Sequence, residues 1–230
     1  MSVITVGAEK GGVAKTRVST HIATLAKAEG ADVVLLDTDP QGSAISWNNI
    51  RKAEAVQPQL SVIALPPNPA EEVRELSSKY DLVVVDIGAQ NYRTMLECAL
   101  LSDLVLVPCG ADQQEIESTL KVFDTLKQLR KPPSKPGQLP SPIPAFVVLT
   151  RVSNLENAKA TRELREYFAG EGVPVFDSHI AYRTSWLTTG KSGRAVHELK
   201  GKERSQKAID EMQAVYDEVK RRVVAEEVTQ

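Results

Sequence analysis

The sequence predicts an α/β fold in which one mostly parallel sheet carries helices on both faces. Short apolar runs without strict alternation recur along the chain, as is typical of strands buried on both sides. Helical segments separate these runs, and a regular alternation of strands and helices indicates a parallel sheet. The chain has 230 residues, of which 42% are apolar, enough for one large core. We therefore expect one domain over residues 1–230, with ligands bound beyond the carboxyl ends of the strands.

The expected elements follow each other in a simple order along the chain. The expected strands are Val3 to Val6, Val33 to Leu36, Leu60 to Leu65, Leu82 to Val85, Leu104 to Val107 and Phe146 to Leu149. The expected helices are Lys15 to Glu29, Ser43 to Glu54, Pro69 to Lys79, Tyr92 to Leu101, Ile116 to Arg130 and Glu156 to Ala169. A last helix is expected over residues 201–224, where apolar residues repeat at three-to-four spacing. Residues 131–144 hold six of the thirteen prolines and are interpreted as a stiff surface loop.

The composition excludes several classes of protein. With 28 Lys and Arg against 30 Asp and Glu, the formal charge is -2, which excludes a histone-like basic protein. Cys98 and Cys109 are too few for a disulfide framework and form no C-x-x-C zinc pattern. No apolar run is long enough to span a bilayer, and the N-terminus has none of the features of a signal peptide. We expect a cytoplasmic protein in which any nucleic-acid surface is confined to one region.

The strongest functional signal is the segment from Gly7 to Thr16, Gly-Ala-Glu-Lys-Gly-Gly-Val-Ala-Lys-Thr, between the first expected strand and the first expected helix. Successive glycines let backbone N–H groups curl around phosphate oxygens at the positive N-terminus of the helix. Lys15 can reach the outer phosphates and Thr16 can ligate magnesium. Glu9 and Ala14 stand where the standard phosphate-loop pattern has glycines, so a Gly-rich turn without a ligand is the alternative. We predict a nucleoside triphosphate site.

Three carboxylates follow buried strands near this loop. Asp37 and Asp39 belong to the segment Leu-Leu-Asp-Thr-Asp-Pro-Gln-Gly, and Asp86 ends the run Leu-Val-Val-Val-Asp. An acid at the end of a strand beside a phosphate loop can hold a metal ion through water and polarise an attacking water. Alternatively, Asp37 and Asp39 cap the helix that follows them.

These segments resemble, in order, three motifs of the ParA/MinD family of deviant phosphate-loop ATPases, and Asp-Pro-Gln-Gly resembles the ParA branch in particular. The similarity extends over essentially the whole chain, although the first 110 residues carry most of its specificity. It implies a P-loop ATPase that forms a nucleotide-sandwich homodimer with ATP and Mg2+. In that family the extra lysine of the loop, here Lys10, reaches across the dimer to the partner's phosphates. Hydrolysis then loosens the dimer, slowly unless a partner protein stimulates it.

The resemblance also assigns roles to individual residues of this sequence. It implies a catalytic role for Lys10, Lys15 and Asp39, and magnesium near Thr16, Asp37 and Asp86. It implies nucleotide contacts by Gly11, Gly12, Val13, Ala14, Lys15, Thr16 and Arg17. Ala14 departs from the family pattern: if the residue before Lys15 needs a positive φ, alanine there costs about 1 kcal/mol relative to glycine.

The charge distribution indicates a candidate DNA-binding face. Residues 183–222 carry ten Lys or Arg against six acids, whereas residues 1–182 carry eighteen against twenty-two. Sequence-independent binding to DNA phosphates needs such a basic end, but a solvated helix with internal salt bridges explains it equally well. ParA proteins coat DNA nonspecifically as ATP-bound dimers, and the resemblance therefore favours DNA and a nucleoid-associated protein. The predicted contacts are Arg183, Lys191, Arg194, Lys202 and Arg204.

The resemblance thus implies an ATPase that segregates or positions a cargo: a plasmid, a chromosome or a protein complex. One alternative is a membrane-associated positioning ATPase like MinD, but the C-terminal residues 220–228 have few bulky apolar side chains for a membrane helix. A second is a nucleotide-gated scaffold that hydrolyses almost nothing, against which Asp39 argues. A third is an iron–sulfur reductase that uses Cys98 or Cys109, although both cysteines are expected to be inert.

Overall fold

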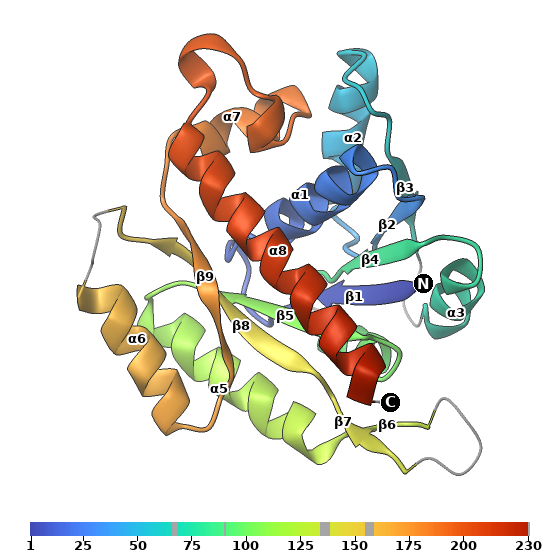
Figure 1. Cartoon of the computed structure of the whole chain (residues 1–230), viewed down its shortest axis with the longest axis vertical. Coiled ribbons are helices and arrows are strands. Elements are labelled where there is room, and N and C mark those ends of the chain that lie inside the picture. The colour runs from blue at the N-terminus through green and yellow to red at the C-terminus, as the bar shows by residue number, and fades with distance from the viewer. Residues whose placement is uncertain (66–68, 90, 134–138, 155–158, 230) are drawn as a thin grey trace.

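The computed structural model confirms the α/β fold with a central parallel sheet (Figure 1). It describes residues 1–65, 69–89, 91–133, 139–154 and 159–229. Of these, residues 226–229 are described by their backbone alone. Seven strands pair in the order β3-β2-β4-β1-β5-β8-β9, and all their described pairings are parallel. They are β1 (Ser2–Val6), β2 (Val33–Asp37), β3 (Ser61–Ala64), β4 (Leu82–Asp86), β5 (Leu104–Cys109), β8 (Ala145–Val152) and β9 (Val175–Ala181). Two further strands, β6 (Arg130–Lys131) and β7 (Ser141–Pro142), form a separate antiparallel ribbon.

Helices cover both faces of the sheet. One apolar cluster joins the sheet to α3 (Ala70–Ser77), α4 (Tyr92–Ala99), α5 (Gln113–Gln128) and α6 (Lys159–Gly170). The other joins it to α1 (Lys15–Ala28), α2 (Ser43–Ala53), α7 (Ser185–Ser192) and α8 (Gln206–Thr229), with two 3-10 turns, η1 (Val196–Glu198) and η2 (Gly201–Glu203), before α8. Successive residues of the central strands alternate between the two clusters, as strand geometry requires.

The structure corrects the expected elements in three places. All six expected strands are present, but β9 was missed because its middle, Asp177 to His179, is polar and interrupts the apolar run. Helix α7 was also missed, and the last helix begins at Gln206 and continues to Thr229 instead of spanning 201–224. The proline-rich segment is bounded by the ribbon of β6 and β7, and residues 134–138 lie outside the described part, as do 155–158 before α6.

The topology brings the predicted site residues to one edge of the sheet. Strand β1 lies between β4 and β5, so the chain passes to β2 and β3 on one side and to β5, β8 and β9 on the other. Val6 pairs with Asp86, and Asp86 pairs with Asp37 on the far side of β4. The phosphate loop after β1 and both carboxylates therefore meet where a parallel sheet reverses its strand order, the usual place for a ligand.

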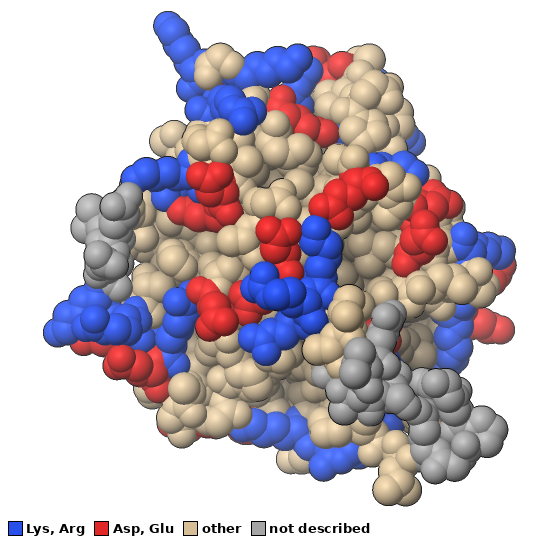
Figure 2. Space-filling view, viewed as in Figure 1, with Lys and Arg blue, Asp and Glu red and all other residues tan. Residues whose placement is uncertain are grey.

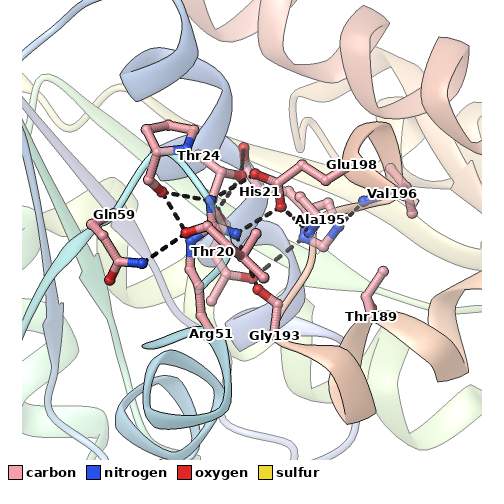
Figure 3. A network of polar contacts seen from close by, with 12 residues as sticks. Thr20, His21, Thr24, Arg51, Gln59, Thr189, Gly193, Ala195, Val196 and Glu198 are labelled. Carbon is pink, nitrogen blue, oxygen red and sulfur yellow. Dashed lines mark hydrogen bonds and ion pairs between the residues drawn. The ribbon is translucent and has the colours of Figure 1, made fainter. Parts of the chain in front are cut away.

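A buried charge pair ties the segment after α7 to helix α2 (Figure 3). The guanidinium of Arg51 is fully buried and donates to both carboxylate oxygens of Glu198, at 2.7 and 2.6 Å. It also donates to the carbonyl oxygens of Gly193, at 3.0 Å, and Pro58. Because every charge in this cluster is hydrogen-bonded, removing one partner would leave an uncompensated buried ion, which typically costs about 3–5 kcal/mol.

A second buried contact ties the same segment to α1. Nδ1 of His21 lies 2.7 Å from the carbonyl oxygen of Arg17, and Nε2 accepts a hydrogen bond from the backbone N–H of Val196 at 3.0 Å. Burial lowers the pKa of His21 to about 3, so the ring is neutral and donates through Nδ1. The segment 189–198 is thus fixed against the two helices that begin at the phosphate loop and at the Asp37 loop.

We predict that Gly193→Ala strongly destabilises the protein, whereas Gly190→Ala does not. A Cβ on Gly193 would lie 2.3 Å from the backbone nitrogen of Arg51, and its φ of 62° already disfavours a side chain. A Cβ on Gly190, inside α7, meets nothing within 4 Å. Chemical denaturation should show a loss of at least about 2 kcal/mol for the first variant and a small gain for the second. Equal effects would contradict this packing.

Candidate nucleotide-binding site

The loop between β1 and α1 has the backbone geometry of an anion site. Gly12 and Ala14 adopt left-handed conformations, with φ of 76° and 75°. Helix α1 starts at Lys15 without a side-chain cap and without an acidic residue in its first turn. The N-terminal N–H groups and the positive end of the helix dipole are therefore left for an external anion.

The expected strain at Ala14 is confirmed. Ala14 precedes the helix with φ 75° and ψ 22°, a conformation that glycine adopts freely and alanine does not. The loop keeps this conformation because its neighbours fix it: the Thr150 hydroxyl donates to the carbonyl oxygen of Val13 at 3.0 Å, and Val13 is buried in the core.

Lys15 lies inside the loop. Its ammonium donates to the carbonyl oxygen of Lys10 at 2.8 Å, so it spans the space that the loop encloses. Burial lowers the pKa of Lys15, and the charges of Asp86 and Asp39 act in the opposite direction. A partly buried ammonium with such weak compensation is well suited to bind phosphate.

Lys10 points away from this loop. Its side chain is exposed and its ammonium lies 3.3 Å from Oε1 of Gln114, on α5. The preceding Glu9 accepts a hydrogen bond from the hydroxyl of Ser118, also on α5. These contacts place Lys10 on the outer surface of the site, apart from Lys15.

Asp86 fits a magnesium site. Ser19 donates to its Oδ1 at 3.0 Å, whereas its buried Oδ2 has no hydrogen-bond partner among the described residues. Burial raises the pKa of Asp86 to about 7, and the hydroxyls of Thr16 and Ser19 act in the opposite direction. A buried carboxylate oxygen without a donor, beside the Thr16 hydroxyl, suits a divalent cation and its bound water.

Asp37 caps the helix that follows it, which was one of the two interpretations of its sequence position. Its Oδ2 accepts hydrogen bonds from the backbone N–H groups of Ala44 and Ile45, at 2.8 and 3.0 Å, and its Oδ1 from that of Asp39. Asp37 therefore caps α2, whose own N-cap, Gly42, offers no side chain. Both carboxylate oxygens of Asp37 therefore accept hydrogen bonds from the backbone, whereas Oδ2 of Asp86 accepts none from a described residue.

Asp39 is held on the surface of the loop before α2. Its Oδ1 accepts from the N–H of Gln41 at 2.9 Å, and no described residue donates to the second oxygen. Gly88, after β4, packs directly against it: a Cβ there would lie 3.0 Å from the Cα of Asp39. Asp39 is thus positioned by backbone contacts, while its second carboxylate oxygen receives no hydrogen bond from a described residue, as a residue that orients water requires.

Arg17 separates two cavities beside α1. Its guanidinium stacks 5.9 Å from the ring of Trp186 and forms no ion pair with a described acid. Burial lowers the pKa of Arg17, and the charge of Arg151 adds to this effect. An open cleft of about 460 Å³ contains Thr16, Arg17 and Gln41, and a smaller pocket on the other side contains Ala14, Arg17, Tyr182 and Trp186. Of the other predicted nucleotide contacts, Thr16 lines the cleft and Ala14 the smaller pocket, whereas Gly11, Gly12, Val13 and Lys15 belong to the loop that leads into α1.

The predicted DNA contacts divide into two groups. Arg183 forms a partly buried ion pair with Glu211 of α8, and Arg194 lies 4.0 Å from Glu54. Lys191, Lys202 and Arg204 are exposed. Figure 2 shows Lys and Arg side chains, with some Asp and Glu beside them, at the end of the molecule where α7 lies, and acidic and basic side chains next to each other across the middle of the same face. We call the exposed cations Lys191, Lys202 and Arg204, in and after α7, the basic surface. Arg183 lies just before α7, but its charge is paired with Glu211.

Several residues that support the site had no signal in the sequence. Ser19 and Thr150 look like ordinary helix and strand residues, yet one binds Asp86 and the other fixes the loop. Asn91 donates to the carbonyl oxygen of Thr38 at 2.7 Å and so supports the Asp39 loop. The proximity of Gly88 to Asp39 depends on the pairing of β2 with β4, which no local pattern reveals.

Comparison with known proteins agrees with this geometry. Residues 4–196 match the model of the CobQ/CobB/MinD/ParA nucleotide binding domain. The chain belongs to this family. It is a family of nucleotide-binding ATPases that includes partition and positioning proteins, and it accounts for the loop, the carboxylates and the parallel sheet of this ParA/MinD-type chain.

Individual relatives cover most of the chain. The Maintenance of carboxysome distribution protein A of Gloeobacter kilaueensis is 32% identical over 196 residues, which cover 84% of this chain and 82% of that protein. Protein ParA of Rhizobium radiobacter is 22% identical, with 88% of each chain covered. The solved structure of the septum site-determining protein MinD from Pyrococcus horikoshii, complexed with Mg-ADP, has a TM-score of 0.68 at 16% identity and 95% coverage of both chains. Within the described residues, no helix is long and apolar enough to cross a membrane.

We predict that Ala14→Gly tightens ATP binding or leaves it unchanged, and stabilises the protein by about 1 kcal/mol, because glycine relieves the left-handed strain. The matched control is Gly12→Ala: the φ of Gly12, 76°, is within one degree of that of Ala14, and an added Cβ would meet nothing within 4 Å. It should lose a similar amount of stability. Calorimetric titration and thermal unfolding measure both effects, and a clear loss of ATP affinity in Ala14→Gly would contradict the loop geometry.

Proposed function

We propose that this protein is an ATP-dependent dimerising ATPase that binds DNA nonspecifically and so segregates or positions a cargo. The observation that carries the proposal is the separation of the two loop lysines. Lys15 and the backbone of the loop suffice for the phosphates of the chain's own nucleotide. Lys10 is exposed on the outer surface, where a second copy of the chain could present its nucleotide.

ATP then acts as the link between two subunits. In each subunit the left-handed loop and the start of α1 hold the phosphates, Lys15 neutralises their charge, and Arg17 lies beside the nucleotide. Lys10 adds its charge to the partner's phosphates only after association. This arrangement favours the dimer in the ATP state, because binding energy is gained only when both chains are present.

Hydrolysis needs a positioned water and charge neutralisation. In this proposal Asp39, whose second carboxylate oxygen accepts no hydrogen bond from a described residue, orients the attacking water and accepts its proton. Magnesium, held by Thr16 and by Asp86 with its unpartnered oxygen, would neutralise phosphate charge. Asp37 acts on hydrolysis indirectly: it caps α2 and accepts a hydrogen bond from the N–H of Asp39, which fixes the Asp39 loop. Hydrolysis should reset the dimer, at a slow rate until a partner protein stimulates it.

The basic surface supports nonspecific DNA binding. Lys191 in α7, Lys202 in η2 and Arg204 directly after η2 are exposed. The buried network around Arg51 fixes this segment against α1 and α2, so the cations are presented on a rigid support. In a homodimer two such surfaces can contact one duplex, and the affinity of a dimer exceeds that of a monomer by avidity.

The relatives suggest the range of cargoes. One is named for the maintenance of carboxysome distribution and another is named ParA. We infer that the cargo of this protein is a plasmid, a chromosome or a protein complex, joined to the dimer through an adaptor protein. On the same grounds we expect a nucleoid-associated protein of the cytoplasm.

The experiment measures binding to a random-sequence DNA duplex with ATP, with ADP and without nucleotide, at two salt concentrations. We expect binding only with ATP, and affinity that falls steeply with salt because counterions are released from phosphates. Lys202→Glu should weaken binding and lower the salt slope by about one. The matched control, Arg162→Glu on α6, reverses an equal charge on an exposed helix and should change little. DNA binding in no state, with intact ATP binding, would contradict the DNA-dependent mechanism.

A further inference from the structure

The two edges of the central sheet differ in how their backbone is satisfied. Strand β9 forms one edge. Its N–H groups that do not pair with β8 donate hydrogen bonds to carboxylates of α8. Glu218 accepts from the N–H groups of Asp177 and Ser178, at 3.1 and 2.9 Å, and Glu211 accepts from that of Ala181. This edge is closed, because unpaired N–H groups of an edge strand are otherwise open to another chain.

The other edge, β3, has no such cover from the described residues. Asp37 pairs with Ala64, and the N–H of Leu65 donates to the carbonyl oxygen of Asp37, so the N–H groups of alternate residues point toward β2. By this alternation the N–H groups of Val62 and Ala64 point outward. Neither donates a hydrogen bond to a residue that the structure describes.

The sequence of β3 also lacks the features that usually prevent edge pairing. The strand Ser-Val-Ile-Ala contains no charge and no proline, and three of its four residues are exposed. Ile63 is 37% exposed although it is a large apolar residue. Natural edge strands are commonly blunted by lysine, proline or a bulge. This strand is open to a further strand.

A cleft beside this strand indicates the chemistry of its partner. It has a volume of about 410 Å³ and is lined by residues 60–63 together with Lys27, Lys52, Gln59 and Tyr80. The lining contains two lysines and no acid. Lys27 is held by Asp32 at 3.2 Å, whereas Lys52 forms no ion pair with any described residue. The cleft thus offers a cation, an aromatic ring and apolar side chains next to free backbone donors.

We propose that β3 is a docking site for an extended segment of a partner protein, which adds to the sheet as an eighth strand. The segment alternates apolar side chains, which contact Ile63 and Tyr80, with acidic side chains, which pair with Lys52. Backbone hydrogen bonds to Val62 and Ala64 supply affinity, and the alternating side chains supply specificity. The site lies on β3 and the ends of α1 and α2, away from the phosphate loop, and goes beyond the proposed nucleotide-dependent activities.

The test uses the full chain and two synthetic peptides, one of alternating valine and glutamate and one of alternating valine and lysine. Amide hydrogen exchange of Val62 and Ala64 is followed by NMR as peptide is added. We expect the glutamate peptide to slow exchange at both amides and to bind at least about tenfold more tightly than the lysine peptide.

Three variants separate the backbone and charge contributions. Ala64→Pro removes the outward N–H without removing a bond to β2, and should abolish binding of the glutamate peptide. Ala64→Ser keeps the N–H and should bind normally. Lys52→Glu should reverse the preference between the two peptides.

Three results would overturn the proposal. One is the absence of any change at Val62 and Ala64 with millimolar glutamate peptide. Another is equal binding of both peptides to the protein and to Lys52→Glu. The last is protection of both amides that rises with protein concentration without peptide, which would show that a second copy of the chain occupies the edge. None of these outcomes depends on nucleotide or DNA, so failure here and failure of the proposed function are distinguishable.

Discussion

The site depends on positive charge that the protein itself leaves uncompensated at the start of α1. Lys15 and Arg17 lie in the first turn of a helix whose dipole is positive at that end, and no acidic residue caps it. Two residues in left-handed conformations, Gly12 and Ala14, lie in the loop that leads into this helix. These positive charges repel one another when no anion is bound, and the phosphates of a nucleoside triphosphate would neutralise them. Strain at Ala14 adds to the cost of the arrangement.

The remaining parts of the site hold their positions relative to this loop through the sheet and through buried polar contacts. The pairing of β1 with β4 and of β4 with β2 places Asp86 beside the loop and Asp37 beyond it. Asp37 accepts hydrogen bonds from the first turn of α2 and so fixes this helix relative to β2. Arg51 of α2 in turn binds Glu198, in the segment before α8. One continuous set of contacts therefore connects the phosphate loop with the basic surface.

Much of this could be predicted from the sequence because the relevant signals are local. Apolar runs gave six strands, and the glycines and lysines between Gly7 and Thr16 located the loop. Contacts between distant segments could not be predicted. The polar centre of β9 is stable because Glu218, forty residues later, satisfies it. Arg183 counted as a free cation in the charge balance, but Glu211 binds it. Asp37 resembled a metal ligand, and only the start of α2 showed that its oxygens were engaged.

The central claim is that ATP joins two copies of the chain through Lys10. Sedimentation equilibrium of the intact protein and of Lys10→Ala, each with ATP and magnesium, with ADP and without nucleotide, tests it most directly. The account predicts a mass of twice 25.1 kDa only for the intact protein with ATP. Lys10→Ala should stay monomeric but still bind ADP, since its own loop and Lys15 are unchanged. A Lys10→Ala protein that dimerises with ATP as tightly as the intact chain would contradict the account.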